Sequence, residues 1–377
     1  MSPRDPHRPL RIAVDATTWA PARTGVGLYT ERLLRAWQQL AYGDQLLLLT
    51  NRFADTAAAS GLQVYGPAMP VRALWLQTAM PLQLLRFAPD VAFFPNYLAP
   101  LLPLPHIPYV LTVHDLAVFL YPETFTFKKR VLQRAALPWL VRRAAAIVVP
   151  SENTRRDLLR LLPTDPAKVV VTPLAAPPDI GEAPSPELVG QVRRDLGLPE
   201  RYLLSVGTLE PRKNVVRLIE AFERIATEFG DVQLVIAGGK GWRDEDISRA
   251  LRRPELKARI VSVGYVTPDQ LKVLYHQALA LCYPSLYEGF GLPVVEAMAC
   301  GTPVLTSRGS SLDEVAGTAA LAVDPLDVGA IAAGIRQMLA DPELRQRMRV
   351  QGLARAGELS WQRTAEQTRQ VITSVLE

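Results

Sequence analysis

The sequence predicts an α/β protein with two domains, each built around a parallel sheet. Short apolar runs alternate with helical segments along most of the chain, which is typical of parallel sheets flanked by helices. The chain has 377 residues, more than one hydrophobic core usually organises. A proline-rich stretch, P-L-A-A-P-P-D-I-G-E-A-P-S-P, interrupts the pattern near the middle and indicates a boundary between the domains.

The composition is that of a soluble globular protein, with 49% hydrophobic and 21% charged residues. The N-terminus lacks the apolar core of a signal peptide, and no uninterrupted apolar run reaches the ~18 residues of a membrane span. We therefore expect a cytoplasmic protein. Cys282 and Cys300 lie in apolar surroundings without a C-x-x-C pattern, so we expect buried thiols rather than a disulfide or a metal site. The net charge of +5 favours an anionic partner, but no nucleic-acid-binding motif is recognisable, so no nucleic acid is expected.

The first predicted domain comprises residues 1–178. It begins with a strand over Leu10–Ala16, and Gly25 and Gly27 open the helix that follows. The third glycine of a dinucleotide fingerprint is missing, so a Rossmann cofactor site is not expected, and an ordinary turn before a helix remains an alternative. Further buried strands are predicted over Leu46–Thr50, Val91–Phe94, Tyr109–Val113, Ala146–Pro150 and Val169–Thr172.

His114 and Asp115 directly follow one of these predicted strands, in the segment V-H-D-L. Ligands of open α/β sheets bind at the carboxyl ends of strands, so both residues are candidates for a site. A lone histidine is more often structural, and the residues alone leave the two roles open.

Residues 179–199 are predicted as the linker, and residues 200–356 as the second domain. A last segment, 357–377, is predicted as a helix that Trp361 anchors and that packs back on the first domain. Strands of the second domain are predicted over Tyr202–Val206, Val232–Ala237, Ile260–Val263, Leu279–Tyr283 and Val304–Thr306.

A basic turn follows the first strand of the second domain, in G-T-L-E-P-R-K-N. Arg212 and Lys213 at a strand's carboxyl end suit a diphosphate, although a solvated basic turn is the simpler interpretation of two cations. Asp244–Asp246, D-E-D, could suggest a metal site. We expect the start of a surface helix instead, because acids favour a helix N-terminus.

The segment from Tyr283 to Val304 combines a strand end, a glycine loop and a helix. Pro293 suits the first position of this helix, which ends at Gly301. Glycines and a helix N-terminus let an anion approach backbone N–H groups, which predicts a phosphate site. Two carboxylates, Glu288 and Glu296, frame the loop and suit vicinal diols. The alternative is a solvated loop acid and an acid in the first helical turn that complements the helix dipole.

These motifs resemble glycosyltransferase family 4, the retaining glycosyltransferases of group 1 with the GT-B fold. The segment E-G-F-G-L-P-V-V-E resembles the family's E-x7-E motif, G-T-L-E-P-R-K-N resembles the diphosphate-binding turn of its mannosyltransferase-like branch, and V-H-D-L resembles its H-D pair. The resemblance covers nearly the whole chain. It implies two Rossmann-like domains facing a cleft, and metal-independent transfer of a hexosyl unit from a nucleoside diphosphate sugar with retention.

The resemblance also implies roles for single residues. Arg212 and Lys213 would neutralise the leaving diphosphate, Glu288 would hold sugar hydroxyls, and His114 would contact the sugar; these four are the expected catalytic residues. Asp115 is expected to contact the acceptor or to be structural. No metal and no cofactor are expected. Donor-binding roles are implied for Gly25, Gly27, Tyr265, Val266, Gly289, Phe290, Gly291, Leu292 and Glu296, with Glu296 on the ribose.

The basic turn most resembles the mannosyltransferase-like branch, so GDP-mannose is the expected donor, and a UDP-sugar is the alternative. The implied acceptor is a glycan or a lipid-linked molecule in the synthesis of cell-surface polysaccharide or glycolipid. Two other functions are considered. One is a catalytically inactive sugar-nucleotide-binding subunit, against which the intact motifs argue. The other is a sugar phosphorylase or epimerase on the same fold, for which no pyridoxal-phosphate lysine or matching carboxylate set is recognised.

The segment Phe125–Arg143 is basic and apolar at once. No acidic residue occurs between Glu123 and Glu152, while the segment contains Phe127, Val131, Leu132, Leu137, Trp139 and Leu140 among Lys128, Lys129, Arg130, Arg134, Arg142 and Arg143. Such a segment can lie in the interface of an anionic bilayer, which predicts peripheral contact with the inner face of the membrane. The alternative is a helix whose apolar residues pack on the sheet and whose cations are solvated.

Overall fold

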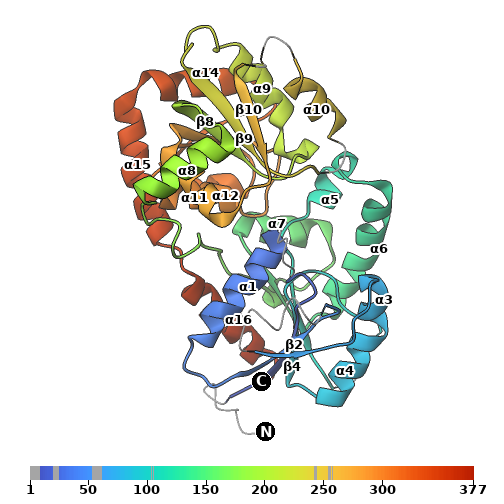
Figure 1. The fold of residues 1–377 in the computed structure, drawn as a ribbon. Helices are drawn as coiled ribbons and strands as arrows, with labels where there is room; N and C mark the ends of the chain where they lie inside the picture. The colour runs from blue at the N-terminus through green and yellow to red at the C-terminus, as the bar shows by residue number, and fades with distance from the viewer. Residues whose placement is uncertain are drawn as a thin grey trace. The chain divides into compact units, whose positions relative to one another are not determined.

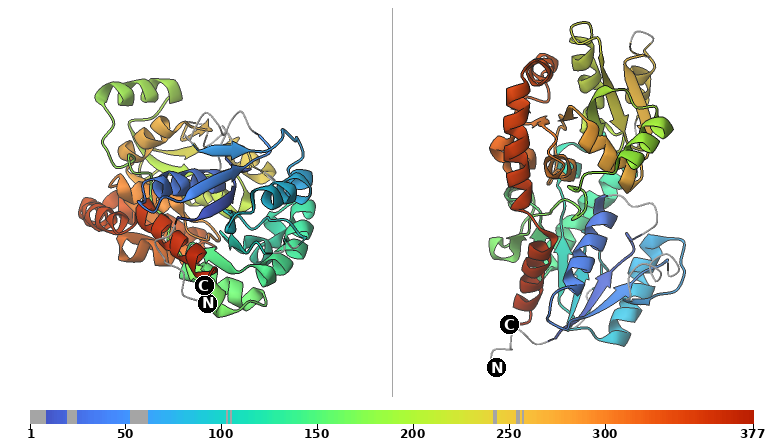
Figure 2. Two further views of the ribbon diagram at one scale, coloured as in Figure 1. Left: turned by 90° about the horizontal axis from the view of Figure 1, so that it is seen from below. Right: turned by 60° about the vertical axis from the view of Figure 1, so that its left-hand side comes forward.

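The computed structural model describes residues 9–19, 25–52, 62–102, 104, 106–241, 244–253, 256 and 258–377. The chain divides into two compact units (Figures 1 and 2). Unit 1 comprises Met1–Phe119, Val131–Leu174 and Ser360–Glu377, and unit 2 comprises Leu120–Arg130 and Ala175–Leu359. Each unit contains one parallel sheet, which confirms the predicted α/β fold class.

Unit 1 contains a seven-stranded parallel sheet in the order β3-β2-β1-β4-β5-β6-β7. Its strands are β1 (Arg11–Asp15), β2 (Gln45–Leu49), β3 (Gln63–Tyr65), β4 (Val91–Phe94), β5 (Tyr109–Thr112), β6 (Ala146–Val149) and β7 (Val169–Val171). The strands β4 and β6 are buried along their whole length, as continuous apolar runs in parallel sheets are. The three-residue edge strand β3 was not predicted, because Q-V-Y is too short to show a period.

The helices that begin in unit 1 are α1 (Gly25–Gln38), α3 (Arg72–Gln77), α4 (Ala79–Phe87), α5 (Ala117–Leu120), α7 (Glu152–Leu161) and α16 (Trp361–Ser374), with a 3-10 turn η2 (Pro166–Lys168). Ser151 caps α7, because its side chain accepts a hydrogen bond from the backbone N–H of Thr154. The long helix α6 (Phe127–Arg143) begins in unit 2 and continues into unit 1, after the 3-10 turn η1 (Pro122–Thr124).

Unit 2 contains a six-stranded parallel sheet in the order β10-β9-β8-β11-β12-β13. The strands are β8 (Arg201–Val206), β9 (Val232–Ala237), β10 (Ile260–Gly264), β11 (Ala280–Tyr283), β12 (Val304–Ser307) and β13 (Ala320–Val323). Counted within the unit, this order is 3-2-1-4-5-6, that of a doubly wound Rossmann sheet. The last strand, β13, was not predicted.

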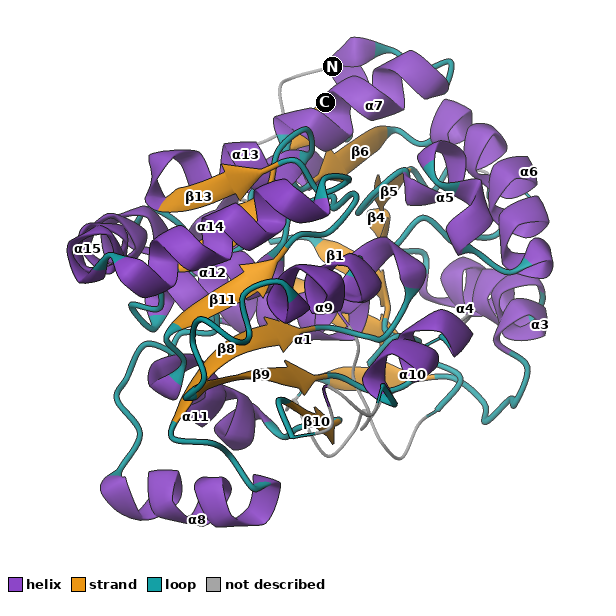
Figure 3. Cartoon of the chain, turned by 90° about the horizontal axis from the view of Figure 1, so that it is seen from above, coloured by secondary structure: helices purple, strands orange, loops and turns teal. Residues whose placement is uncertain are grey.

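Helices cover both faces of the unit 2 sheet (Figure 3). They are α8 (Pro186–Leu196), α9 (Val215–Glu223), α10 (Glu245–Leu251), α11 (Pro268–Gln277), α12 (Leu292–Ala299), α13 (Ser311–Ala316), α14 (Val328–Ala340) and α15 (Pro342–Gly357), with 3-10 turns η3 (Pro211–Lys213) and η5 (Gly317–Ala319). Alternate strand residues point to opposite faces. In β8, Leu203 packs in the core beneath α9 and α14, while Tyr202 and Leu204 pack beneath α8, α11 and α12.

The residues predicted as a linker, 179–199, belong to unit 2 and contain a helix. The prolines do not prevent this helix, because Pro186 occupies the first position of α8. The backbone N–H that proline lacks would have no partner within the helix at that position. Ser185 caps α8, and Val192 is buried in the core of the unit. The composition of this segment therefore marked a change of domain but not an unstructured connection.

The C-terminal helix α16 is part of unit 1, where it lies beside α1 (Figures 1 and 2). Trp361 is buried at its first position. A buried ion pair fixes the helix further along, with Arg369 Nε 2.7 Å from Asp44 Oδ2. The same carboxylate accepts hydrogen bonds from Trp37 Nε1 and from the backbone N–H of Leu10. Burial opposes ionisation of Asp44, but these hydrogen bonds and the charge of Arg369 lower its pKa.

Among the described residues, no helix is both long and apolar enough to cross a membrane.

Candidate active site

The strand order of unit 2 reverses between β8 and β11, so the loops that follow these two strands lie on either side of a topological switch point. Ligands of open α/β sheets bind in the crevice outside the carboxyl ends of the strands at such a point. The first loop leads to η3 and contains Arg212 and Lys213, and the second leads to α12 and contains Glu288 and Gly291. The topology therefore brings both predicted motifs together.

Close backbone approaches position the first loop. Gly207 has φ +142°, and a Cβ at Gly238 would lie 1.8 Å from the carbonyl oxygen of Gly207, so no side chain fits there. Asn214 adopts φ +60° and donates hydrogen bonds from Nδ2 to the carbonyls of Pro284 and Pro325. These contacts hold the end of η3 against the loop after β11.

Four charged side chains from the two loops form a buried cluster. Arg212 Nη1 lies 2.7 Å from Glu288 Oε2, and Arg212 Nη2 lies 2.6 Å from Glu210 Oε1. Lys213 Nζ lies 2.6 Å from Glu288 Oε1. The exposed fraction of these side chains ranges from 3% for Glu210 to 14% for Lys213. Because burial weakens solvent screening, these ion pairs orient both cations strongly.

Neutral donors complete the surroundings of Glu288. Its Oε1 accepts hydrogen bonds from Ser285 Oγ at 2.5 Å and from Tyr283 Oη at 3.0 Å. Burial raises the pKa of Glu288, but the charges of Arg212 and Lys213 together with the hydrogen bonds outweigh burial and lower the pKa to about 2. Glu288 is therefore ionised at neutral pH. Three donors crowd Oε1, so a ligand hydroxyl would find room more readily at Oε2.

Lys213 also contacts Tyr283, with Nζ 2.6 Å from the phenol oxygen and 5.0 Å from the ring centroid. Burial lowers the pKa of Lys213, and the charge of Glu288 opposes this decrease. The pKa of Tyr283 is raised well above its ordinary value, first by burial and then by the charge of Glu288. The phenol therefore stays protonated and can donate to Glu288.

The glycine loop enters α12 as predicted. Gly291 has φ +101°, and a Cβ there would lie 2.3 Å from Leu312 Cδ2. Pro293 is the second residue of α12, the first helical turn contains no acidic residue, and the chain leaves the helix through Gly301. Phe290 is 6% exposed, so its ring is buried and only its backbone is suited to a ligand. The N-terminus of α12 adds backbone N–H groups beside the charged cluster.

The sequence predicts Pro293 at the first position of the helix, so Glu296 lies one residue further into α12 than predicted. The helix begins at Leu292, so Glu296 is its fifth residue and not part of the first turn. Its carboxylate is buried and accepts a hydrogen bond from Tyr275 Oη at 3.0 Å. The interpretation of Glu296 as an acid that complements the helix dipole in the first turn is therefore wrong. Its predicted contact with a ribose stays a prediction.

Tyr265 and Val266 follow the edge strand β10, at the same carboxyl edge of the sheet as the cluster. Tyr265 is 66% exposed, and a Cβ at Gly239, which follows β9, would lie 4.0 Å from Tyr265 Cβ. An exposed aromatic ring beside a glycine offers a flat surface on which a nucleotide base can stack. This location is compatible with the predicted contact with the base.

In unit 1, His114 follows β5. Its Nε2 lies 2.8 Å from the carbonyl oxygen of Pro95, and its ring meets Tyr29 edge-on at 4.7 Å. Because a carbonyl only accepts, Nε2 carries the proton and Nδ1 is left as the acceptor. Burial lowers the pKa of His114, so the ring is neutral at pH 7. Asp115 accepts a hydrogen bond from the backbone N–H of Ala117 and so caps α5, which gives it a structural role.

The two predicted glycines of unit 1 occupy the first turn of α1. Gly25 is its first residue and is exposed, with nothing within 4 Å of a Cβ built on it. Gly27 is buried in the same turn. The residues just before α1 lie outside the described part of the chain.

Sequence reasoning missed several polar residues that the structure places at these sites. Glu210 stands inside the predicted basic turn, and Tyr283 and Ser285 flank the end of β11. In unit 1, a cluster forms at the carboxyl ends of β1 and β4, where Asp15 contacts Thr17, Arg72 and Asn96. An acid at or shortly after the end of a buried strand was the available signal, because Asp15 is the last residue of β1 and Glu210 is four residues after β8.

The residues Asp244–Asp246 begin α10, as expected of a surface helix. Within the described ranges, no group of three or more histidine, cysteine and acidic residues is suited to hold a metal ion. Cys282 and Cys300 are buried free thiols, as predicted, and burial raises the pKa of each to about 12.

Two family models match the chain. Residues 191–355 match "Glycosyl transferases group 1", and residues 23–179 match "Glycosyltransferase Family 4". O-antigen chain mannosyltransferase B of Escherichia coli is 35% identical over 260 residues, which cover 69% of this chain and 68% of that protein. Serotype-specific mannosyltransferase WbdA of Escherichia coli is 27% identical over 80% of this chain, but the match spans only 39% of WbdA.

Solved structures show the same fold. HepE of Anabaena, crystallised with UDP-glucose, has a TM-score of 0.78 and 18% identity, over 97% of this chain and 100% of that chain. Two doubly wound units with a cluster of cations and carboxylates at the switch point of the second define a glycosyltransferase of the GT-B fold class. The chain belongs to glycosyltransferase family 4, the group 1 glycosyltransferases.

Proposed function

We propose that the protein is a retaining, metal-independent mannosyltransferase that transfers mannose from GDP-mannose to a glycan or lipid-linked acceptor during synthesis of a cell-surface polysaccharide such as O-antigen. The observation that carries the proposal is the cluster of Arg212, Lys213 and Glu288 beside the N-terminus of α12. Mannosyltransferase relatives support the sugar and the class of product.

The cluster matches the main chemical demand of the reaction, which is to stabilise a departing diphosphate while the sugar gains positive charge. Glu288 orients Arg212 and Lys213 through these ion pairs, so little reorganisation is needed when charge develops. The N-terminus of α12 adds partial positive charge at the same place. In this proposal Glu288 both orients the cations and accepts hydroxyls of the sugar through Oε2.

The remaining predicted residues complete the proposal. His114 would contact the transferred sugar, Tyr265 and Val266 the base, and Glu296 the ribose. No side chain is assigned as nucleophile. The acceptor hydroxyl would attack from the side of the leaving group, and a phosphate oxygen would take its proton, so that the sugar configuration is retained.

A UDP-sugar is the second candidate donor. HepE of Anabaena, the structural neighbour with a TM-score of 0.78, was crystallised with UDP-glucose. The proposed contacts to the base run mainly through backbone groups, so a different base could be accepted with small changes.

Competition between nucleotides distinguishes the two donors. We expect GDP to bind more tightly than UDP in calorimetric titrations, and GDP-mannose to be the donor consumed with octyl mannoside or a lipid extract as acceptor. Proton NMR of the product at early times should show the anomeric configuration of the donor. A clear preference for UDP would overturn the choice of donor, and tight nucleotide binding without any transfer would favour a binding subunit.

We further propose that the protein contacts anionic membranes through α6 and its neighbours. Of the six apolar residues predicted for this contact, Phe127, Val131, Leu132 and Trp139 are 48–71% exposed, whereas Leu137 and Leu140 are buried. Exposed apolar residues continue in unit 1 at Val71, Leu74, Leu82, Leu85, Leu101 and Leu102. Trp139 Nε1 donates a hydrogen bond to the carbonyl oxygen of Leu101, so the loop that contains Leu101 and Leu102 lies against α6. Apolar side chains beside cations are suited to the interface of a lipid bilayer.

A further inference from the structure

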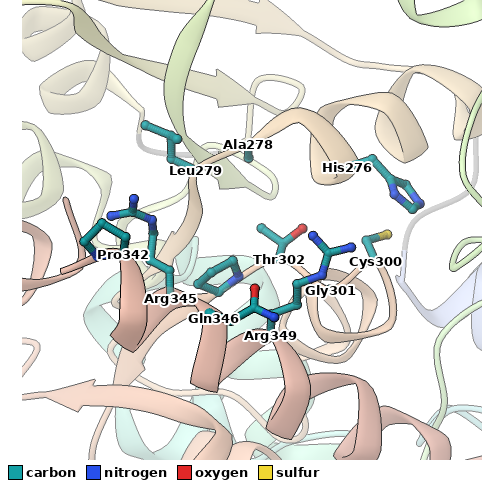
Figure 4. Close-up of a pocket in the computed structure, with 11 residues that line it drawn as sticks. His276, Ala278, Leu279, Cys300, Gly301, Thr302, Pro342, Arg345, Gln346 and Arg349 are labelled. Carbon is teal, nitrogen blue, oxygen red and sulfur yellow. The ribbon is translucent and has the colours of Figure 1, made fainter. Parts of the chain in front are cut away.

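A second cavity lies at the opposite edge of the unit 2 sheet from the candidate active site. It has a volume of about 280 Å³ and lies at the amino ends of β11 and β12, beside the C-terminal end of α12 and the first turns of α15 (Figure 4). The candidate active site lies at the carboxyl ends of the same strands. The two sites therefore share α12, which begins at one and ends at the other; its eight residues span about 12 Å.

The charge of the cavity lining has one sign. Arg345 and Arg349 line the cavity, and no aspartate or glutamate is among the lining residues. The two arginines are four residues apart on α15, and their guanidinium groups are turned toward opposite ends of the cavity (Figure 4). The cavity therefore favours a negatively charged ligand.

Each arginine is placed by neutral groups rather than by a carboxylate. Arg345 Nη1 donates to the carbonyls of Met338 and Leu339 at the end of α14. Arg349 lies over Gly301, which has φ +69° and where a Cβ would stand 3.2 Å from Arg349 Nε. Within the described part of the chain, neither guanidinium forms an ion pair. No carboxylate of the described residues therefore neutralises the guanidinium group of Arg349, whereas that of Arg345 is held by the carbonyls at the C-terminal end of α14.

Neutral polar groups line the rest of the cavity. Gln346 lies between the two arginines on α15, and Thr302 and His276 lie across from them (Figure 4). His276 Nε2 is 2.9 Å from the carbonyl of Ile180 and so carries the proton, which leaves Nδ1 as an acceptor. Thr302 donates to the carbonyl of Tyr275, which leaves its oxygen as an acceptor. Two acceptors and an amide suit the hydroxyl groups of a sugar.

We propose that this cavity is a second ligand site that binds a phosphomonoester, with the phosphate at the guanidinium group of Arg349 and a monosaccharide-sized body against Gln346, Thr302 and His276. Arginine guanidinium groups bind phosphate oxygens bidentately, which favours phosphate over a carboxylate. The volume of about 280 Å³ is at the lower end for ligand pockets and suits a ligand the size of a hexose phosphate. Inorganic phosphate presents the same phosphate oxygens to the guanidinium group.

Calorimetric titration tests the proposal on the full-length protein saturated with GDP, which keeps the probes out of the donor site. The probes are mannose 6-phosphate, inorganic phosphate and mannose. We expect saturable binding of the first at one site per chain, and Arg349→Ala should weaken it about tenfold, the loss of one charge-assisted interaction. Binding of mannose 6-phosphate alone identifies a sugar phosphate, and equal binding of inorganic phosphate identifies the free anion.

Arg347→Ala is the matched control, because Arg347 is on the same helix, pairs with Asp341 and Glu343, and does not line the cavity. This variant should bind mannose 6-phosphate as the wild type does. Arg349→Gln serves as a second variant if the alanine variant unfolds. Absence of saturable binding to the wild type, equal weakening by the Arg347 and Arg349 variants, or binding of mannose as tight as that of its phosphate would overturn the proposal.

Ligand binding in the proposed second site does not depend on the proposed donor or reaction. GDP affinity and mannosyl transfer should be retained in Arg349→Ala, because Arg349 lies at the amino edge of the sheet. A protein without transferase activity that still binds mannose 6-phosphate would contradict the proposed function alone.

Discussion

The polar contacts of the candidate active site converge on Glu288. Its carboxylate is shared by Lys213, Arg212, Ser285 and Tyr283, which come from two loops on either side of the switch point. Removing either cation leaves this buried charge partly unpaired, so effects on stability and on catalysis must be measured separately. The residue-scale predictions concern these two effects.

Lys213→Ala should lower the rate of sugar transfer by about 10²-fold or more, as the loss of a preorganised group that stabilises developing charge does. Because Arg212 still pairs with Glu288, the variant should fold, which circular dichroism and its melting temperature would show. Arg201→Ala is the control, since Arg201 forms an exposed pair with Asp231 in the same unit and should transfer sugar normally. Turnover of Lys213→Ala close to that of the wild type would contradict the role of Lys213.

The pKa of Glu288 predicts how stability depends on pH. Its pKa falls from an ordinary 4.5 to about 2 on folding, so the unfolded chain takes up a proton first as the pH decreases. The contribution of Glu288 to stability is complete above about pH 4.5 and is lost as the pH falls through about 2. The apparent free energy of unfolding, measured in urea across this window, should therefore fall more steeply in the wild type than in Glu288→Gln. Equal slopes would show that Glu288 is not held ionised.

At the scale of elements, the glycine loop and α12 act as one unit. Gly291 takes a backbone conformation that side chains disfavour, and Leu312 of α13 fills the space that a side chain would need. The N-terminus of α12 is thereby held beside the charged cluster. At the other end, Gly301 lets the chain turn and makes room for Arg349.

Gly291→Ala should cost about 1–2 kcal/mol of stability from its positive φ alone, with a further cost for the contact with Leu312. Nucleotide affinity should fall as well, because the loop must move. Gly230→Ala is the control, since nothing lies within 4 Å of a Cβ there and its φ is not positive. Adding Leu312→Ala to the first variant should recover part of the loss. Unchanged melting temperature and nucleotide affinity in Gly291→Ala would show that the loop tolerates a side chain.

At the scale of the whole molecule, exposed apolar residues are unevenly distributed along the chain. Ten of the large ones in the described residues fall between Val71 and Trp139, on α3, α4, α6 and a connecting loop. The helix α6 also carries several cations, including Lys128 and Arg142, and contains no acidic residue. This combination underlies the proposal of membrane contact.

Vesicle co-sedimentation tests this contact. Binding to vesicles of anionic lipid should fall with added salt, and the change of Lys128, Lys129 and Arg130 to glutamate should weaken it, because each cation near the surface contributes about 1 kcal/mol. The control changes Arg194, Arg201 and Arg249 to glutamate; these are exposed in unit 2 and alter the net charge equally. Binding that ignores salt, or that both triple variants weaken alike, would exclude a specific membrane surface on α6.

The sequence by itself determined the features that depend on interactions between residues close together in the chain. Apolar runs located eleven of the strands to within a residue or so, and the glycine loop, Pro293 and Gly301 located α12, because backbone preferences and burial act over a few residues. The resemblance of the motifs then identified the family. The edge strand β3 was not predicted because it is short, and the helix α8 was not predicted because prolines mask its pattern.

Only the tertiary structure decided which residues share a site. Arg212 and Glu288 are 76 positions apart, and Asp44 and Arg369 are 325 apart, yet each pair forms a buried ion pair. Such pairs depend on strand order and on exclusion of water, neither of which a local pattern contains. For the same reason, only the assembled sheet shows three further features. These are the partners of Glu288, the position of Glu296 within α12 and the basic cavity at the amino edge of the unit 2 sheet.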